Sequence, residues 1–272
     1  MPKNFQKRFD GKTAIITGGA AGIGWATALN LANSGADVAI CSRPGTTLGA
    51  ATDKIAKTGL SNIQCYSADV SNKDDVGKMM NGIDEKFGKL DYVVNNAGID
   101  GFVDWNNFST EEWHRTMNVN LLAVFLVIEA SLSLMQKTDA GSIVNVSSIH
   151  AHLTVSGRAA YTASKAALSG ATRAMAIDMG KHGIRVNTVS PGVVYTAMLE
   201  RSMAANSPDI KAETIIERLS QMHPVGRIGR PDDIAKTIAF LLSDDAAFVT
   251  GVDLIADGGM HTRLSNAFAW GT

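Results

Sequence analysis

The fold of this chain is decided by residues 17–24, Thr-Gly-Gly-Ala-Ala-Gly-Ile-Gly, a glycine-rich stretch between two ordered elements. The apolar run at 13–17 predicts a buried strand, and residues 25–33 have a helical pattern. A pyrophosphate binds where backbone amides, a close backbone approach and a helix N-terminus converge. Glycine permits that approach because it carries no Cβ. The strand–turn–helix context therefore predicts a dinucleotide site, with a glycine-rich tight turn as the simpler alternative.

Short apolar runs and helical patterns alternate along the rest of the chain. The predicted strands are 13–17, 37–41, 63–67, 91–95, 142–147, 184–190 and 252–256. The predicted helices are 25–33, 47–57, 73–87, 110–135, 159–182 and 231–242. Strands without polar alternation, each separated by a helix, indicate a parallel sheet covered on both faces. We therefore expect an α/β fold, a Rossmann-like doubly wound parallel sheet of about seven strands with helices on both faces.

The whole chain of 272 residues, 1–272, is expected to form a single domain. It has no internal repeat, no low-complexity stretch and no linker-like change in composition. The one long departure from the alternation is 196–229, which contains several methionines and small polar residues. A segment of this length without the regular pattern is expected to be a substrate lid and not a second domain.

Composition and charge narrow the class of protein. The chain carries 25 Lys and Arg against 26 Asp and Glu, so it lacks the basic excess of proteins held to nucleic acid by charge. The longest unbroken apolar run, 121–128, is far shorter than the roughly 20 residues of a membrane span. The first ten residues contain no apolar core of a signal peptide, and two cysteines exclude a disulfide scaffold. We expect a cytoplasmic protein with neither nucleic acid nor membrane as a partner.

Five further motifs follow the glycine loop. They are Asp69 in Ala-Asp-Val at 68–70, Asn-Asn-Ala-Gly at 95–98, Pro191-Gly192 with Thr196, Gly-Arg-Ile-Gly-Arg-Pro at 226–231, and Asp-Gly-Gly at 257–259. With the loop spacing T-G-x-x-x-G-x-G, these motifs resemble the short-chain dehydrogenase/reductase family over residues 11–259. The resemblance implies reversible hydride transfer between a nicotinamide cofactor and a secondary alcohol or carbonyl substrate.

The resemblance also implies which residues hold the cofactor. Asp69 matches the position that contacts the adenine ring, and the segment from Pro191 to Thr196 matches the one that holds the nicotinamide carboxamide. The predicted cofactor-binding residues are Gly18, Gly22, Ile23, Gly24, Ser42, Arg43, Asp69, Val70, Asn96, Ala97, Gly98, Tyr161, Lys165, Pro191, Gly192, Val194 and Thr196. No metal is expected.

Ser42 and Arg43 end the second predicted strand, where dinucleotide sites select their cofactor. A carboxylate at this position hydrogen-bonds the ribose 2′-hydroxyl of NAD(H) and repels a 2′-phosphate. The hydroxyl and guanidinium found here suit the phosphate instead, unless Arg43 is only a solvated loop residue. We expect NADP(H) to be preferred, with NAD(H) as the alternative. Ala20 and Ala21 count against this preference, because many NADP-preferring relatives carry a basic residue in the loop.

Tyr161 and Lys165 are four residues apart, which places them on one face of a helix. Ser148 follows the fifth predicted strand, and its spacing to Tyr161 favours it over Ser147. Lys165 and a positive nicotinamide ring are expected to lower the Tyr161 pKa from its ordinary value near 10. Tyr161 would then exchange a proton with the substrate, and Ser148 would hydrogen-bond the substrate oxygen. Lys165 would also bind the nicotinamide ribose.

Asn120 is the fourth catalytic residue that the resemblance implies. It stands in the sequence Val-Asn-Leu at 119–121, which matches the family pattern, whereas Asn118 does not. In the family this residue holds a water that joins the lysine to solvent, and a helix kink or core hydrogen bond is the simpler explanation. The apolar stretch 121–128 lies on the helix that pairs in family tetramers, which implies a homotetramer, with an ordinary buried helix as the alternative.

The substrate is expected to be a sugar or polyol, because polar residues lie near the predicted site: Asp100, Asp104, His150, His152 and Arg158. His150 and His152 are equally consistent with a loop role, and a metal site lacks an evident third ligand. The runner-up substrate is a 3-oxoacyl thioester on acyl carrier protein. That substrate needs a basic docking patch, for which Arg173 alone is thin evidence.

A function of another class is a non-catalytic regulator that binds the cofactor. The chain retains the complete set of Asn120, Ser148, Tyr161 and Lys165. Because drift without selection for turnover would have damaged at least one of these residues, the sequence favours an enzyme.

Overall fold

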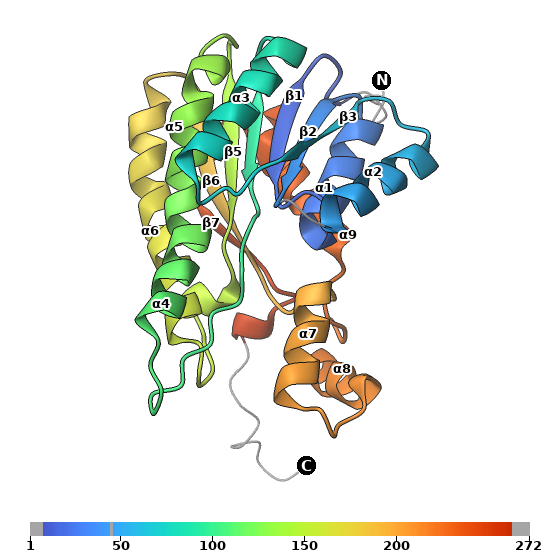
Figure 1. Ribbon diagram of the computed structural model, residues 1–272, viewed down its shortest axis with the longest axis vertical. Coiled ribbons are helices and arrows are strands. Elements are labelled where there is room, and N and C mark those ends of the chain that lie inside the picture. Colours follow the sequence, from blue (N-terminus) through green and yellow to red (C-terminus); the bar gives the residue numbers. More distant parts are fainter. Residues whose placement is uncertain (1–7, 44–45, 263–272) are drawn as a thin grey trace.

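The computed structural model describes residues 8–43 and 46–262, and its centre is one seven-stranded sheet (Figure 1). The strands are β1 Thr13–Thr17, β2 Asp37–Ser42, β3 Ile63–Ser67, β4 Tyr92–Asn95, β5 Gly141–Val146, β6 Ile184–Pro191 and β7 Asp253–Ala256. The α-helices are α1 Gly22–Asn33, α2 Thr46–Thr58, α3 Lys73–Phe87, α4 Thr110–Met117, α5 Ala123–Met135, α6 Ala159–Gly180, α7 Ala197–Asn206, α8 Ala212–Gln221 and α9 Pro231–Leu242. Shorter turns are a π-helix at Asn118–Leu122 and 3₁₀ helices at Ile149–Ala151, Asp244–Ala246 and Met260–Thr262.

All strand pairs are parallel, in the order β3-β2-β1-β4-β5-β6-β7. The chain runs outward from β1 to β3 and then crosses back to place β4 on the other side of β1. Ile16 accordingly has Ile40 of β2 as one register partner and Val94 of β4 as the other. In sheets of this kind, ligands bind beyond the carboxyl ends of the strands at such a reversal. The topology therefore points to the end of β1 and β4.

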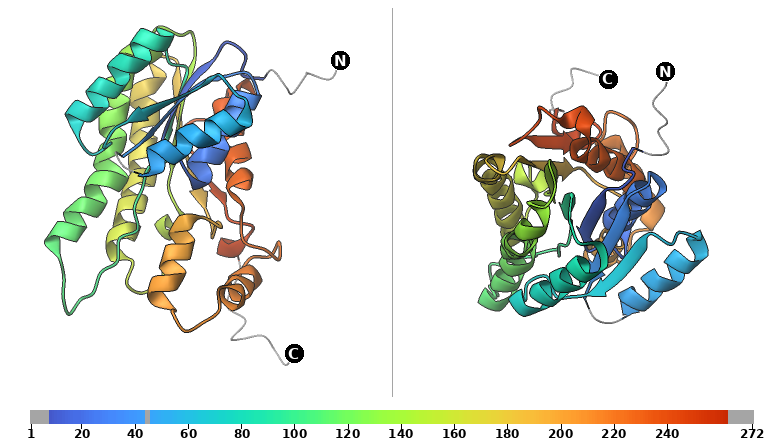
Figure 2. Two further views of the ribbon diagram at one scale, coloured as in Figure 1. Left: turned by 45° about the vertical axis from the view of Figure 1, so that its right-hand side comes forward. Right: turned by 90° about the horizontal axis from the view of Figure 1, so that it is seen from above.

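Helices cover both faces of the sheet, as the view from above shows (Figure 2). Alternate residues of each strand enter opposite cores: Ile16 packs with α1 and α9, whereas its neighbour Ile15 packs with α3, α5 and α6. Both side chains are fully buried. Burial on both faces is why the strands read as continuous apolar runs. The predicted doubly wound sheet is confirmed.

Two predicted helices differ from those observed. The helix after the glycine loop begins at Gly22 and not at residue 25, so the last glycines of the loop form its first turn. The predicted helix 110–135 is divided by a π-helical turn, Asn118–Leu122, between α4 and α5. As one segment, Thr110–Met135 is long and apolar enough to cross a membrane. Its α5 part packs against α3 in the layer that covers the sheet.

The predicted lid, 196–229, contains helices α7 and α8 and lies beyond the carboxyl ends of the strands (Figure 1). Its two ends meet, because Val194 forms a parallel bridge with Gly229. The Tyr195 amide donates to the Gly229 carbonyl at 2.9 Å, and the Gly229 amide donates to the Val193 carbonyl at 2.8 Å. The segment therefore leaves and rejoins the main domain at one place.

Candidate active site

A cavity of about 410 Å³ opens at the carboxyl end of the sheet. The glycine loop, the ends of β4, β5 and β6, the start of α6 and helix α7 form its walls. Thirteen of the predicted site residues line it, namely Gly18, Gly22, Ile23, Asn96, Ala97, Gly98, Ser148, Tyr161, Lys165, Pro191, Gly192, Val194 and Thr196. The structure thus brings together residues from most of the length of the sequence.

The glycine loop is shaped by two positive backbone angles and one close approach. Gly18 and Gly22 have φ values of +63° and +53°, which favour glycine over every other residue. Gly24 has an ordinary φ, but a Cβ on it would lie 2.4 Å from the Gly18 carbonyl oxygen and 2.5 Å from Asn96 Nδ2. The backbone therefore passes where no side chain fits.

Asn96 and Thr17 hold this loop against β4. Asn96 Nδ2 donates to the carbonyl oxygens of Thr17 and Gly18 at 2.9 and 3.2 Å. In return, Thr17 Oγ1 accepts from the backbone amides of Asn96 and Ala97, both at 3.0 Å. The side chain of Asn96 is thus used to position the loop.

The N-terminus of α1 faces the cavity beside this loop. Among the described residues, no side chain caps the helix at Ala21, and its first turn has no acidic residue. Its amides and the positive end of the helix dipole suit a phosphate group. The glycine cradle and this helix end therefore fit the pyrophosphate of a dinucleotide.

Besides Gly24, four of the predicted cofactor residues lie outside the cavity lining, namely Ser42, Arg43, Asp69 and Val70. They stand at the ends of β2 and β3, with Arg43 exposed. Burial alone would raise the pKa of the Asp69 carboxyl, but hydrogen bonds from Ser71 and the nearby Arg43 guanidinium lower it. Ser71 donates from both its amide and its hydroxyl, at 2.9 and 2.6 Å. Arg43 and Asp69 are therefore close enough to interact at the place predicted for the adenosine.

Tyr161, Ser148 and Lys165 meet on the cavity floor. The Ser148 hydroxyl hydrogen-bonds the Tyr161 phenol and also accepts from the His150 amide at 3.2 Å. Lys165 Nζ lies 5.8 Å from the centre of the Tyr161 ring and donates to the Val146 carbonyl at 2.9 Å. The rival Ser147 instead donates to the Lys165 carbonyl at 3.0 Å. The serine that contacts Tyr161 is therefore Ser148, the one that its spacing to Tyr161 in the sequence favoured.

Burial shifts the pKa values of this group away from their ordinary values. Burial raises the pKa of the Tyr161 phenol, and the hydrogen bond from Ser148 only partly opposes that effect. Burial also lowers the pKa of Lys165 to about 8. Desolvation disfavours the charged form of each group. The lowering of the Tyr161 pKa by Lys165 together with the positive nicotinamide ring concerns the site with cofactor bound and stays a prediction.

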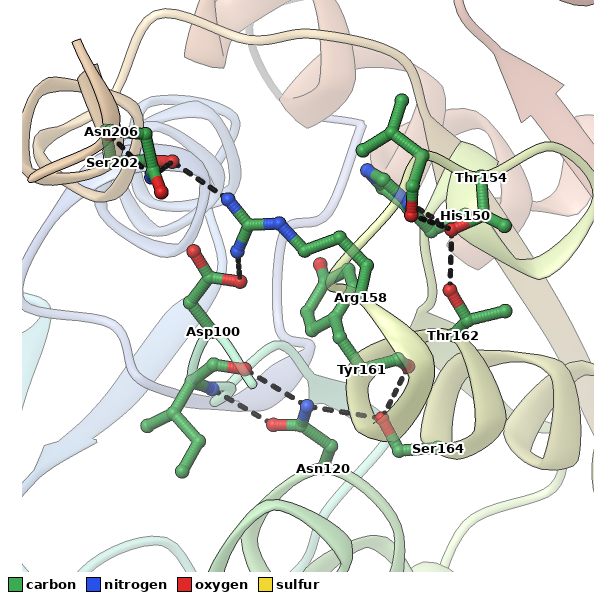
Figure 3. Close-up of polar contacts among 12 residues, drawn as sticks. Asp100, Asn120, His150, Thr154, Arg158, Tyr161, Thr162, Ser164, Ser202 and Asn206 are labelled. Carbon is green, nitrogen blue, oxygen red and sulfur yellow. Dashed lines mark hydrogen bonds and ion pairs between the residues drawn. The ribbon is translucent and has the colours of Figure 1, made fainter. Parts of the chain in front are cut away.

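Asn120 lies behind Lys165, in the π-helical turn, and does not line the cavity. Its side chain makes a closed pair with the backbone of Ile99: the Ile99 amide donates to Oδ1 at 2.8 Å, and Nδ2 donates to the Ile99 carbonyl at 2.9 Å. Nδ2 also donates to Ser164 Oγ at 3.1 Å (Figure 3). A Cβ on Gly98 would lie 3.4 Å from Asn120 Oδ1 and 3.5 Å from Lys165 Nζ, so Gly98 separates the two.

The two histidines diverge. His150 lines the cavity, where its ring packs edge-on against Tyr161 with centroids 5.5 Å apart. Burial and the neighbouring Arg158 guanidinium lower the His150 pKa. His152 instead pairs with Asp253 at 2.9 Å and does not line the cavity, and neither does Asp104. Of the five polar residues expected near the site, His152 and Asp104 therefore lie outside the cavity lining. In the part of the chain that the structure describes, no group of three or more His, Cys, Asp or Glu is arranged to hold a metal ion.

Comparison with known proteins gives three informative matches beside a family model. A model described as enoyl-(acyl carrier protein) reductase matches residues 18–261. The levodione reductase of Leifsonia aquatica is 34% identical over 93% of this chain and 95% of its own. The chain belongs to the short-chain dehydrogenase/reductase family. A 3-oxoacyl-[acyl-carrier-protein] reductase of Thermotoga maritima is 36% identical over 93% and 99%. The ligand-free aldohexose dehydrogenase of Thermoplasma acidophilum matches with a TM-score of 0.85 at 30% identity, over 96% and 98%.

This short-chain dehydrogenase/reductase is an oxidoreductase of alcohol and carbonyl groups, and its family uses nicotinamide cofactors. Three residues that line the cavity or contact a predicted site residue were not identified from the sequence. Ser202 and Arg201 of α7 line the cavity, and Ser164 of α6 bonds Asn120. Ser164 lies within the Tyr161–Lys165 motif, so its position could have drawn attention. Nothing in the sequence of 196–229 distinguishes Ser202 from the neighbouring polar residues.

The close approach at Gly24 gives a direct test of the loop. Gly24→Ala is expected to lower kcat/KM for the cofactor by about 100-fold, because a displacement of ~1 Å at a binding site has effects of that order. Cofactor binding followed by fluorescence titration should weaken in parallel.

Gly77→Ala is the matched control, since Gly77 also lies in a helix and has nothing within 4 Å of the added Cβ. It should leave cofactor binding unchanged and stabilise the protein by about 0.5–1 kcal/mol. Equal cofactor affinity in Gly24→Ala and the wild type would contradict the proposed loop geometry.

Proposed function

We propose that this chain catalyses reversible hydride transfer between NADP(H) and a secondary alcohol or ketone that carries further hydroxyl groups, such as a sugar or polyol. The observation that carries the proposal is the contact of Ser148 with Tyr161 on the floor of a cavity that the glycine loop also lines. The bound nicotinamide would accept or donate the hydride. Everything else in the reaction falls to side chains of this chain.

Tyr161 would take the proton of the substrate hydroxyl during oxidation and return it during reduction. Its phenol is placed for this by Ser148, whose hydroxyl would also hydrogen-bond the substrate oxygen and stabilise its developing charge. The raised Tyr161 pKa favours the protonated form, which is the one that donates during carbonyl reduction. Oxidation needs the phenolate and is therefore expected to speed up toward alkaline pH.

Lys165 would bind the nicotinamide ribose and hold positive charge near Tyr161. Its buried ammonium, already bonded to the Val146 carbonyl, would gain further hydrogen-bond acceptors from the ribose. Asn120 would support this arrangement from behind, because its amide fixes Ile99 directly after the Gly98 turn. We place Asn120 in the site as a positioning residue on this ground, alongside its expected role in holding a water.

The remaining cofactor contacts are also proposed from the positions of residues around the cavity. Gly18, Gly22, Ile23 and Gly24 would hold the pyrophosphate, and the segment from Pro191 to Thr196 would face the nicotinamide. Gly192 approaches Asp257 so closely that a Cβ would lie 2.8 Å from the Asp257 Cα. The segment 196–229 would act as a lid over the substrate.

A homotetramer in the cytoplasm is the assembly and location that we propose. Leu122 and Phe125, which lie at the junction of the π-helical turn and α5, are each 45% exposed. Apolar side chains left exposed on a helix of the outer layer suit a contact between copies of the chain. Light scattering of the purified protein would give its mass in solution.

Reduction of a 3-oxoacyl thioester is the second candidate activity. The match to the Thermotoga reductase favours it. The ion pair of Asp100 and Arg158 on the cavity wall counts against it, because an acyl chain packed against this pair would offer it no hydrogen-bond partner in place of water. Two assays separate these activities. One follows the oxidation of NADPH in the presence of acetoacetyl-CoA, and the other follows the reduction of NADP⁺ by a panel of polyols.

Tyr161→Phe tests the proposed mechanism. The variant is expected to lose about 10³-fold in kcat, the usual contribution of a general acid–base group, while still binding the cofactor. Turnover would be followed by NADPH absorbance, and cofactor binding by fluorescence. Full turnover in this variant would refute the assigned role, and a wild type inactive on every alcohol and ketone of a broad panel would favour the cofactor-binding regulator.

Arg43→Ala tests cofactor selection. If the guanidinium binds the 2′-phosphate, the ratio of kcat/KM for NADP⁺ to that for NAD⁺ should fall by about tenfold or more, because hydrogen bonds to charged groups contribute about 1.5–3 kcal/mol. Activity with NAD⁺ should change little. A wild type that already prefers NAD⁺ would overturn the assignment.

A further inference from the structure

Arg158 joins three walls of the site cavity through one guanidinium. It is the residue that precedes α6, and its Nη1 donates to Asp100 in the loop after β4. Its Nη2 donates to Ser202 Oγ of lid helix α7 at 2.9 Å. Figure 3 shows the guanidinium between these two partners, beside the Tyr161 ring. Segments near residues 100, 158 and 202 are thus tied together at the mouth of the site.

The Asp100–Arg158 pair lies on the substrate side of Tyr161. Both residues line the cavity, and both act electrostatically on Tyr161 and on His150. Arg158 stands three residues before Tyr161, and residues at this helical spacing have Cβ atoms about 5–6 Å apart. A molecule whose reacting oxygen meets Tyr161 would therefore have its neighbouring atoms beside the pair.

The pair has hydrogen-bonding capacity to spare. Within residues 8–43 and 46–262, Asp100 Oδ1 accepts from Arg158 and no partner is found for Oδ2. The side chain of Asp100 is 36% exposed and that of Arg158 is 14% exposed. A guanidinium carries five N–H donors, of which two are used here. The pair thus offers an acceptor and a donor together, with no net charge.

These properties select among ligand chemistries. A hydrocarbon group would leave the carboxylate and guanidinium without new partners, and an anion would have to compete with Asp100 for Arg158. A hydroxyl group both donates and accepts, so it can give its hydrogen to Asp100 and receive one from Arg158.

We propose that Asp100 and Arg158 form a subsite for a hydroxyl on the carbon next to the reacting one, so that the preferred substrate is a vicinal diol or the corresponding α-hydroxyketone. This inference rests on the proposed function and names its substrate class. In oxidation, one hydroxyl of the diol loses its proton to Tyr161 and its carbon loses hydride to the cofactor, which leaves the hydroxyketone. The second hydroxyl stays intact and binds the pair.

The bond from Arg158 to Ser202 extends this subsite to the lid. A hydroxyl that engages Asp100 and Arg158 stabilises the guanidinium in the position from which it holds Ser202. Recognition of the second hydroxyl would then stabilise the contact between Arg158 and α7. Ser202 is a positioning residue in this scheme.

The test compares substrates that differ only at the carbon next to the reacting one. They are cyclohexanol, cis-1,2-cyclohexanediol, trans-1,2-cyclohexanediol and 2-hydroxycyclohexanecarboxylate. The wild type is expected to show a kcat/KM about tenfold or more higher for one diol isomer than for cyclohexanol, as expected when a site hydrogen-bonds a substrate hydroxyl. Asp100→Asn should reduce this ratio by about tenfold. A ratio measured within one variant does not depend on how much of it folds.

Asp104→Asn is the matched control, because Asp104 lies in the same loop, outside the cavity, and makes its own turn contact with the Asn106 amide. It should keep the wild-type ratio.

Three results would overturn the subsite. Two of them are equal kcat/KM values for the diol and cyclohexanol in the wild type, and equal loss of the ratio in both variants. A wild-type preference for the hydroxycarboxylate would also overturn it and would indicate an anion site made by Arg158 and Arg201. Turnover of simple alcohols without a diol preference would overturn the subsite and leave standing the hydride transfer of the proposed function, whereas inactivity on all alcohols would remove both.

Discussion

Three backbone segments meet at the carboxyl end of β1 more closely than any side chain would allow. The Gly18 carbonyl oxygen and the side-chain nitrogen of Asn96 occupy the space that a Cβ on Gly24 would fill. Hydrogen bonds between Thr17 and Asn96 hold the segments in this position and join β1 to β4 across the reversal of the sheet. Gly98 and Ile99 come shortly after Asn96 in the chain, and the Ile99 amide donates to Asn120. The contact between Thr17 and Asn96 therefore also sets the position of Asn120 and of the cavity floor. The glycine loop and the group proposed to be catalytic are therefore parts of one packed unit.

The sequence predicted the fold well because each strand is buried on both faces and each crossover is a helix. The π-helical turn at Asn118–Leu122 could not be predicted in the same way. The extra residue in that turn accompanies the pairing of Asn120 with Ile99, a contact between elements 21 residues apart that local periodicity does not report. Likewise, the start of α1 at Gly22 depends on the loop packing and not on helix propensity, which disfavours glycine.

Within the site, spacing identified the residues that share an element, and it failed where side-chain direction or burial decides. Ser148 was distinguished from Ser147 by its distance to Tyr161 along the chain. His150 and His152 could not be separated, because the turn after β5 sends one into the cavity and the other to Asp253. The raised Tyr161 pKa of the protein without cofactor could not be predicted from spacing, because burial of the phenol causes it. Ser202 was missed because only the fold brings α7 to Arg158.

The central claim is that Tyr161 is the acid–base group and that positive charge brought by the cofactor adjusts its pKa. The most direct measurement is a titration of tyrosinate absorbance, taken as the wild type minus Tyr161→Phe, without cofactor, with oxidised cofactor and with reduced cofactor. The account predicts a Tyr161 pKa above its ordinary value of about 10 in the free protein, because burial disfavours the phenolate. The oxidised cofactor, with its positive ring, should lower that pKa, and the reduced cofactor should lower it less. A Tyr161 pKa that is already low in the free protein, or that does not respond to the oxidised cofactor, would contradict the account.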